Sequence, residues 1–182
     1  MLRLFFALQP SPGLGAGLLE SSAPLLTQLQ VPAVPAGNLH ATLCFVGAVA
    51  PERLDALRAA AATVRCAPVT LDFDAYDFWD KPRVLCACVS RESVAAIALS
   101  EALRDASIAA GFAPDAKPFR AHLTLARKIS PTEAEKISWP QKISPGFVVR
   151  CDRFVLMESR REEHGSIYSV VDEWPLYAKE EC

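Results

Sequence analysis

The chain lacks long apolar runs, C-x-x-C cysteine pairs and any large excess of acidic or basic residues. Nowhere in its 182 residues do roughly 18 apolar residues follow one another, so no membrane-spanning helix is expected. The apolar run over 4–8 is too short for the central region of a signal peptide, and we expect a cytoplasmic protein. The 19 basic and 21 acidic residues leave a net charge of −2, which excludes a protein that coats nucleic acid non-specifically but permits one that grips a single phosphate group.

The six cysteines and three histidines also lack the spacings of a metal centre. No C-x-x-C pair is present, and Cys86 and Cys88 alternate on one predicted strand, which is not a zinc-ligand spacing. Neither His-x-His nor His-x-x-x-His occurs, and there is no Walker loop, nucleophile elbow or carboxylate–histidine cluster. We therefore predict no metal and no cofactor, and we expect the cysteines to be reduced and mostly buried.

Hydrophobic periodicity predicts an α+β protein. Apolar residues make up 51% of the chain and no linker or low-complexity tract divides it, so we predict a single domain over 1–182. The predicted order is strand–helix–strand–helix–strand–strand–helix–strand–strand–strand. The helix that opens at Pro12 is expected to kink or break near Ala23, the residue before a proline. The strands are expected over 3–8, 39–46, 69–76, 83–89, 122–129, 147–157 and 166–171, and the other helices begin at Pro51 and Glu92.

A short motif occurs twice, as His40-Ala-Thr42-Leu and His122-Leu-Thr124-Leu, with an offset of 82 residues (122 − 40). Residues i and i+2 of a strand point to the same face, so each copy presents an imidazole beside a hydroxyl. One such pair alone is typical of ordinary surface or core packing, whereas two matched copies half a chain apart favour a site. His164, the remaining histidine, is expected in a solvated charged turn.

Two facing imidazole–hydroxyl pairs are suited to acid–base chemistry on an anion. Imidazole, with a pKa of about 6.5, gives or takes a proton near neutrality, so two of them can act as general base and general acid. Threonine hydroxyls donate to non-bridging oxygens, and nearby cations favour an anion. The simplest chemistry is metal-free in-line displacement at a phosphodiester. The cations near the second motif are Lys117, Arg120, Arg127 and Lys128.

The chain resembles the two-histidine phosphoesterase superfamily, and within it the RNA 2′,3′-cyclic phosphodiesterases, also called 2′-5′ RNA ligases. The resemblance rests on the paired motifs and on softer matches that extend from residue 3 to about residue 176. It implies two pseudo-symmetric lobes, each an antiparallel sheet with helices packed outside, around a central cleft. The softer matches include the opening segment 3–8, Asn38-Leu-His40, Pro82-Arg-Val-Leu85, the segment 118–127 and a Trp174-Pro-Leu176 ending.

The resemblance also implies roles for five residues. His40 is the proton donor to the leaving 3′ oxygen, His122 is the proton acceptor that activates water, and Thr42 and Thr124 bind phosphate oxygens. Arg127 matches the family's phosphate-contacting residue, although strict strand alternation places it opposite His122 unless a bulge or twist intervenes. The motifs themselves are chemically alike and do not decide which histidine is the acid.

The expected partners are RNA ends that carry a 2′,3′-cyclic phosphate, with small cyclic or 2′-5′-linked nucleotides as alternatives, and the expected state is a monomer. The same site run in reverse would form a 2′-5′ bond. The competing hypothesis is a non-catalytic module that binds nucleotides or RNA ends. One aromatic residue could stack on a terminal base, although core packing is the commoner role. The candidates are Phe5, Phe45, Phe78, Trp79, Phe119 and Tyr168.

Overall fold

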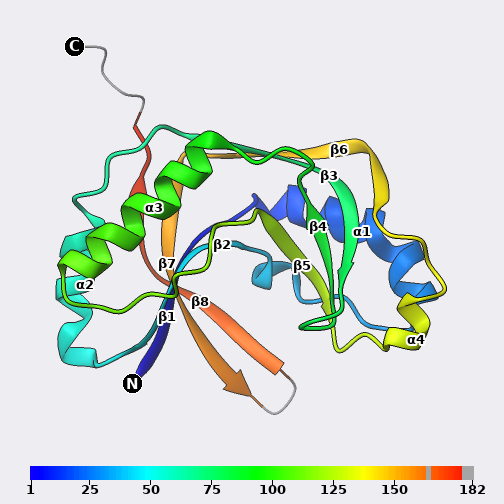
Figure 1. The fold of residues 1–182 in the computed structure, drawn as a ribbon, viewed down its shortest axis with the longest axis horizontal. Helices are drawn as coiled ribbons and strands as arrows, with labels where there is room; N and C mark the ends of the chain where they lie inside the picture. Colours follow the sequence, from blue (N-terminus) through cyan, green and yellow to red (C-terminus); the bar gives the residue numbers. More distant parts are fainter. Residues whose placement is uncertain (163–164, 178–182) are drawn as a thin grey trace.

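The structure, a computed structural model, describes residues 1–162 and 165–177, so the predictions for His164 and Cys182 lie outside the described residues. Two four-stranded antiparallel sheets form the two lobes (Figure 1), which confirms the predicted α+β class and its two-lobe arrangement. The first sheet has the order β2-β1-β7-β8, with β1 (Leu2–Leu8), β2 (Ala41–Val49), β7 (Arg153–Glu162) and β8 (Gly165–Pro175). The second has the order β5-β4-β3-β6, with β3 (Val69–Trp79), β4 (Val84–Cys88), β5 (His122–Arg127) and β6 (Gln141–Cys151).

Each sheet is covered by helices on one face (Figure 1). Helix α3 (Val94–Ala109) packs on β2 and against α2 (Leu54–Ala61), whereas α1 (Pro12–Gln28) packs on β5 and β6 of the other lobe. Alternate residues of β1 enter one large hydrophobic cluster that includes residues of both sheets. The remaining elements are the short helices η1 (Ala36–Asn38), η2 (Pro51–Arg53) and α4 (Pro131–Ala134). Among the described residues, no helix combines the length and apolar character needed to span a membrane.

The prediction of one strand over 147–157 was wrong. The chain there forms two strands in different sheets, because β6 ends at Cys151, bends at Asp152 and continues as β7 on the other side of the molecule. Val149 and Cys151 are buried in one sheet and Phe154 in the other, so the alternation slips by one residue at the exposed pair Asp152 and Arg153. This slip is the one local sign of the change of sheet, because no glycine or proline marks the bend.

Other boundaries also differ from the prediction. Helix α1 is unbroken around Pro24, which lies on its exposed face while Leu18 and Leu26 hold the opposite face in the core. Strand β2 continues past Gly47, whose φ of +91° is available to glycine at little cost. The element α4 was not predicted, β3 extends to Trp79, and the helical segment at Pro51 begins as η2. Among the described residues Cys44, Cys86, Cys88 and Cys151 are buried free thiols, as expected.

Candidate active site

The two His-x-Thr segments lie at the start of β2 and β5, each of which is one edge strand of its sheet, and these two strands contact each other (Figure 1). Each strand carries a bulge directly after its threonine. In β2, Thr42 pairs with Ala7 and the next paired residue is Cys44, so Leu43 is the extra residue. In β5, Thr124 pairs with Cys86 and the next paired residue is Ala126, which makes Leu125 the extra one. The two motifs therefore share one backbone plan.

The bulges decide which residue follows the threonine on the cleft face. Leu125 and Ala126 are both buried, so alternation restarts and Arg127 returns to the face of His122. Phe45 is the equivalent residue of β2. The bulge thus resolves the conflict between strand alternation and the expected position of Arg127. The carbonyl of Leu125 accepts a hydrogen bond from the Val34 amide at 2.8 Å, and that of Leu43 accepts one from the Ser100 hydroxyl at 2.6 Å.

Both histidine rings are held in the same way. The Nδ1 atom of His40 lies 2.7 Å from the carbonyl oxygen of Asn38, and that of His122 lies 2.8 Å from the carbonyl oxygen of Arg120. Because a carbonyl can only accept, each Nδ1 carries a proton, and Nε2 of the neutral ring is left to take one. The Asn38 side chain in turn donates to the carbonyl of Ser166 on β8 at 3.0 Å, which fixes the segment before the first motif.

Both imidazoles pack against aromatic rings. The ring of His40 lies 4.8 Å from that of Phe5 and 4.7 Å from that of Tyr168, and the ring of His122 lies 4.5 Å from that of Trp79. Burial, and to a smaller extent the nearby charges of Arg127 and His122, lower the pKa of His40 to about 4, although its hydrogen bond to Asn38 opposes this shift. Burial, followed by the arginine charges, also lowers the pKa of His122. In the unliganded protein both rings are neutral at pH 7.

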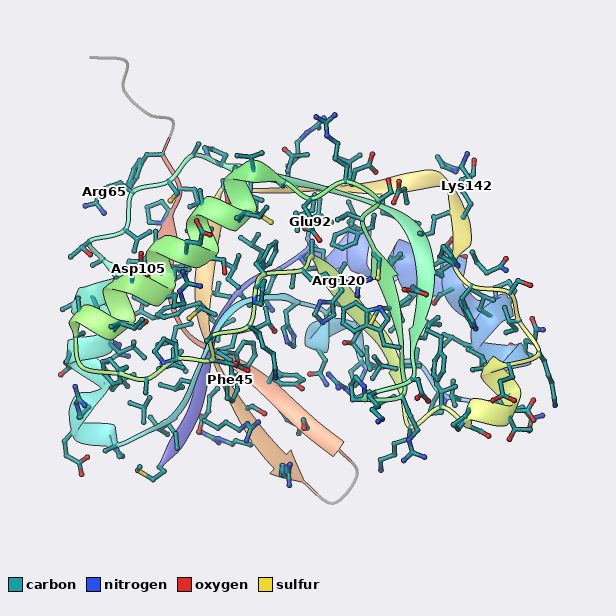
Figure 2. The ribbon with its side chains drawn as sticks, in the orientation of Figure 1. Phe45, Arg65, Glu92, Asp105, Arg120 and Lys142 are labelled. Carbon is teal, nitrogen blue, oxygen red and sulfur yellow. The ribbon has the colours of Figure 1, made fainter. Side chains whose placement is uncertain are left out.

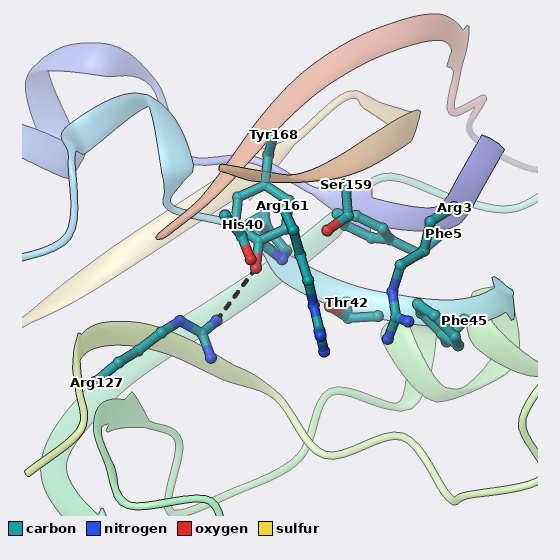
Figure 3. Close-up of a pocket in the computed structure, with 10 residues that line it drawn as sticks. Arg3, Phe5, His40, Thr42, Phe45, Arg127, Ser159, Arg161 and Tyr168 are labelled. Atoms are coloured by element: carbon teal, nitrogen blue, oxygen red, sulfur yellow. Dashed lines mark hydrogen bonds between the residues drawn. The ribbon is translucent and has the colours of Figure 1, made fainter. Parts of the chain in front are cut away.

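One side of the cleft is a pocket of about 260 Å³ beside His40, here called the His40 pocket (Figure 3). Arg127 reaches this pocket from the opposite lobe, and its Nη2 donates to the Tyr168 hydroxyl at 3.4 Å. Arg127, which follows the second motif on β5, thus brings a positive charge to the pocket of His40 in the first motif. The pocket is lined by Arg3, Phe5, His40, Thr42, Phe45, Arg127, Ser159, Arg161, Ser166 and Tyr168.

The other side is a pocket of about 320 Å³ beside His122, here called the His122 pocket, which shares Thr42 and Phe45 with the first. Figure 2 shows Phe45 and Arg120 in the central part of the molecule, where the motif strands approach each other. Thr124 lies on the face of His122 but lines neither pocket, and its side chain hydrogen-bonds with Cys86. Also on the lining are Leu43, Cys44, Trp79, Ser100, Arg104, Asp115, Lys117, Pro118 and Phe119.

Of the six aromatic candidates, five line the pockets, while Phe78 packs against Trp139. Sequence reasoning missed Arg3 and Arg161, and it missed the serines Ser159 and Ser166. The available signal was alternation, because Arg3 shares a strand face with Phe5, and Arg161 with Ser159. Within residues 1–162 and 165–177, no three His, Cys, Asp or Glu side chains are grouped in a way that could hold a metal ion.

Comparisons with known proteins agree with this geometry. A family model described as the 2′-5′ RNA ligase superfamily matches residues 19–163, which include both motifs. A protein of Escherichia coli (strain K12) named RNA 2′,3′-cyclic phosphodiesterase is 30% identical over 145 residues, which are 79% of this chain and 78% of that protein. The crystal structure of E. coli LigT in apo form is 25% identical, with a TM-score of 0.85 over 97% of this chain and 98% of that one. The E. coli LigT structure complexed with 3′-AMP has the same TM-score and identity, and the match covers 97% of this chain and 99% of that one.

Proposed function

Because the chain belongs to the 2′-5′ RNA ligase superfamily, we propose that this phosphoesterase hydrolyses RNA 2′,3′-cyclic phosphate ends to 2′-phosphomonoesters without a metal ion. The observation that carries the proposal is the matched pair of imidazoles. Both have Nδ1 tied to a backbone carbonyl, which leaves Nε2 as the titrating atom on either side of one cleft. A module that only binds nucleotides has no need of two such groups.

In the proposed reaction, water attacks phosphorus in line with the bond to the 3′ oxygen. Nε2 of His122 takes the proton from water as the new P–O bond forms, and the proton on Nε2 of His40 passes to the 3′ oxygen as the P–O3′ bond breaks. The product keeps phosphate on the 2′ oxygen and regains a 3′ hydroxyl. If the 5′ hydroxyl of another strand replaced water as the nucleophile, the same displacement would break the P–O3′ bond and form a 2′-5′ phosphodiester bond.

Arg127 and the two threonines are proposed to bind phosphate. The Arg127 guanidinium lies beside His40, where it can pair with non-bridging oxygens and stabilise their charge in the transition state. Thr42 faces both pockets and can donate from between the two histidines. Thr124 would reach the phosphate only after its hydroxyl exchanges Cys86 for a substrate oxygen.

Substrate charge is needed for the acid role of His40. Its pKa of about 4 in the unliganded protein means that little of it is protonated at neutral pH. A phosphate anion placed against the ring favours the imidazolium and raises that pKa. Binding and protonation are therefore coupled, and the acid forms chiefly in the complex.

The decisive experiment uses a short RNA ending in a 2′,3′-cyclic phosphate, incubated with the protein in EDTA, with the product isomer identified. We expect a 2′-phosphate as product, and loss of turnover by a factor of at least 10² in both His40→Ala and His122→Ala, in keeping with the usual worth of general acid–base catalysis. Thermal unfolding of both variants checks that the lost turnover is not lost folding.

Other outcomes would point elsewhere. Turnover that stops in EDTA and returns with a divalent ion would overturn the metal-free mechanism. Binding of the RNA without turnover, unchanged in His40→Gln and His122→Gln, would support the non-catalytic module instead. Turnover of 2′-5′-linked or small cyclic nucleotides in place of the RNA would keep the mechanism and change the substrate.

A further inference from the structure

Two arginines that line the His40 pocket take no part in the proposed chemistry. Arg3 comes from β1 and Arg161 from β7, and both are exposed. Figure 3 shows the side chains of Arg3 and Arg161 extending into the pocket, with Arg127 entering from another side. The pocket thus receives three guanidinium groups from three different strands.

These charges lack acidic partners within the pocket. Among the described residues, none that lines it is acidic. Arg3 lies over the ring of Phe45 at 4.7 Å, a contact that leaves its N–H groups free for an anion. The carboxylate of Glu158 pairs with Arg160 at 2.7 Å, on the face of β7 opposite Arg161. Three guanidinium groups in a space of about 260 Å³ favour an anionic ligand.

The His122 pocket is different, because its cations are already partnered. Lys117 pairs with Asp115 at 3.1 Å, and Arg120 lies 3.8 Å from Asp77 and over the ring of Trp79 at 4.5 Å. The uncompensated positive charge of the cleft therefore lies on the His40 side. A polyanionic substrate would extend toward that side.

The position of Arg3 along β1 separates its backbone from the place of the reacting phosphate. Ala7 is the register partner of Thr42, and Arg3 lies four residues earlier on β1, about 13 Å along an extended strand. An arginine side chain spans only part of that distance. Arg3 is thus placed to meet a group beyond the reacting phosphate, while Arg127 and Thr42 stand next to it.

We propose that Arg3 and Arg161 bind a second phosphate, the one on the 5′ side of the terminal nucleoside. This inference rests on the proposed function, because a cyclic phosphate occupies the 2′ and 3′ oxygens and leaves the 5′ position as the one place for a neighbouring phosphate. The substrate class is then an RNA end, or a nucleotide that carries a 5′ phosphate, in preference to a nucleoside 2′,3′-cyclic phosphate.

The test compares three substrates: cytidine 2′,3′-cyclic phosphate, the same compound with a 5′ phosphate, and the dinucleotide CpC with a 2′,3′-cyclic end. We expect kcat/KM to be at least tenfold higher for the two that carry a 5′ phosphate, a difference of about 1.4 kcal/mol. The preference should shrink as salt rises. Arg3→Gln combined with Arg161→Gln should bring the ratio close to one, and Arg3→Lys should retain part of it because the charge remains.

Arg150→Gln is the matched control, since Arg150 is an exposed arginine on β6, the strand farthest from β5 in its sheet. It should keep the wild-type ratio. Turnover of all three substrates with equal kcat/KM would overturn the second phosphate site and leave the proposed function standing. If Arg150→Gln and the double variant had the same ratio of kcat/KM with and without a 5′ phosphate, the second phosphate site would also be overturned. No turnover of any substrate would overturn both.

Discussion

The pH dependence of kcat/KM tests whether two buried imidazoles perform the chemistry. Burial and then the charges of Arg127 and His122 lower the pKa of His40 to about 4, and burial lowers the pKa of His122. At pH 7, three units above that value, only about one His40 in a thousand is protonated in the unliganded protein. Since the proposed mechanism needs one neutral ring and one protonated ring, kcat/KM should be bell-shaped.

The sign of each limb follows from these shifts. The acid limb should lie near pH 4, where the second ring gains a proton, and the alkaline limb should begin below the ordinary histidine pKa of about 6.5. Above it, kcat/KM falls about tenfold for each pH unit. The kcat profile should lie at higher pH, because bound phosphate raises the pKa of the facing ring.

Arg127→Gln separates the two effects of this arginine. The guanidinium lowers the pKa of both histidines, so its removal should move the alkaline limb of kcat/KM to higher pH while KM rises. Arg150→Gln should move neither. Steady-state kinetics from pH 4 to 9 measures both profiles. A kcat/KM that stays flat or rises from pH 7 to 9 would refute the paired-imidazole mechanism, and a limb that Arg127→Gln leaves in place would refute the electrostatic part.

Two further substitutions test how the site is supported. Ser100→Ala removes the buried donor to the Leu43 carbonyl and should lower the free energy of unfolding by about 1–3 kcal/mol. The control is Ser107→Ala, whose hydroxyl shares the Leu103 carbonyl with the helix backbone, so this variant should lose less than about 1 kcal/mol. Equal losses for the two variants in urea unfolding would contradict this prediction. Tyr168→Phe removes the hydroxyl that accepts a hydrogen bond from Arg127 at 3.4 Å. Initial-rate measurements should show a KM several-fold higher with little change in kcat. A loss confined to kcat would contradict this role of the Tyr168 hydroxyl.

Local sequence patterns predicted most of the elements and the paired motifs, because both depend on residues close together in the chain. Alternation placed His40 beside Thr42 and the leucines on the opposite face. The bulge after Thr124 could only be offered as one explanation for Arg127, since a bulge depends on the partner strand. The change of sheet at Asp152 is marked only by a one-residue slip in the alternation, with no glycine or proline.

Long-range pairing also explains why the sequence did not predict Arg3 and Arg161 as residues of the His40 pocket. Arg3 and Arg161 are far apart in sequence and meet because β1 pairs with β7, where Phe5 lies opposite Met157. Nothing near either arginine indicates that pairing. Long-range strand pairing, more than residue type, therefore set the limit of what the sequence could predict about the cleft.

The two half-sites share a backbone plan and differ where the bulge returns the chain to the cleft face. There β2 carries Phe45 and β5 carries Arg127. The two rings have the same tautomer, since both Nδ1 atoms face carbonyls, so the tautomer cannot distinguish acid from base. The distinction must come from the surroundings of Nε2, and Arg127 places its charge in the pocket of His40. In the proposed mechanism, a phosphate drawn to that charge would be held against His40, and its negative charge would let His40 hold a proton. We therefore propose that the difference between Phe45 and Arg127 at matching positions helps to give the two histidines different tasks.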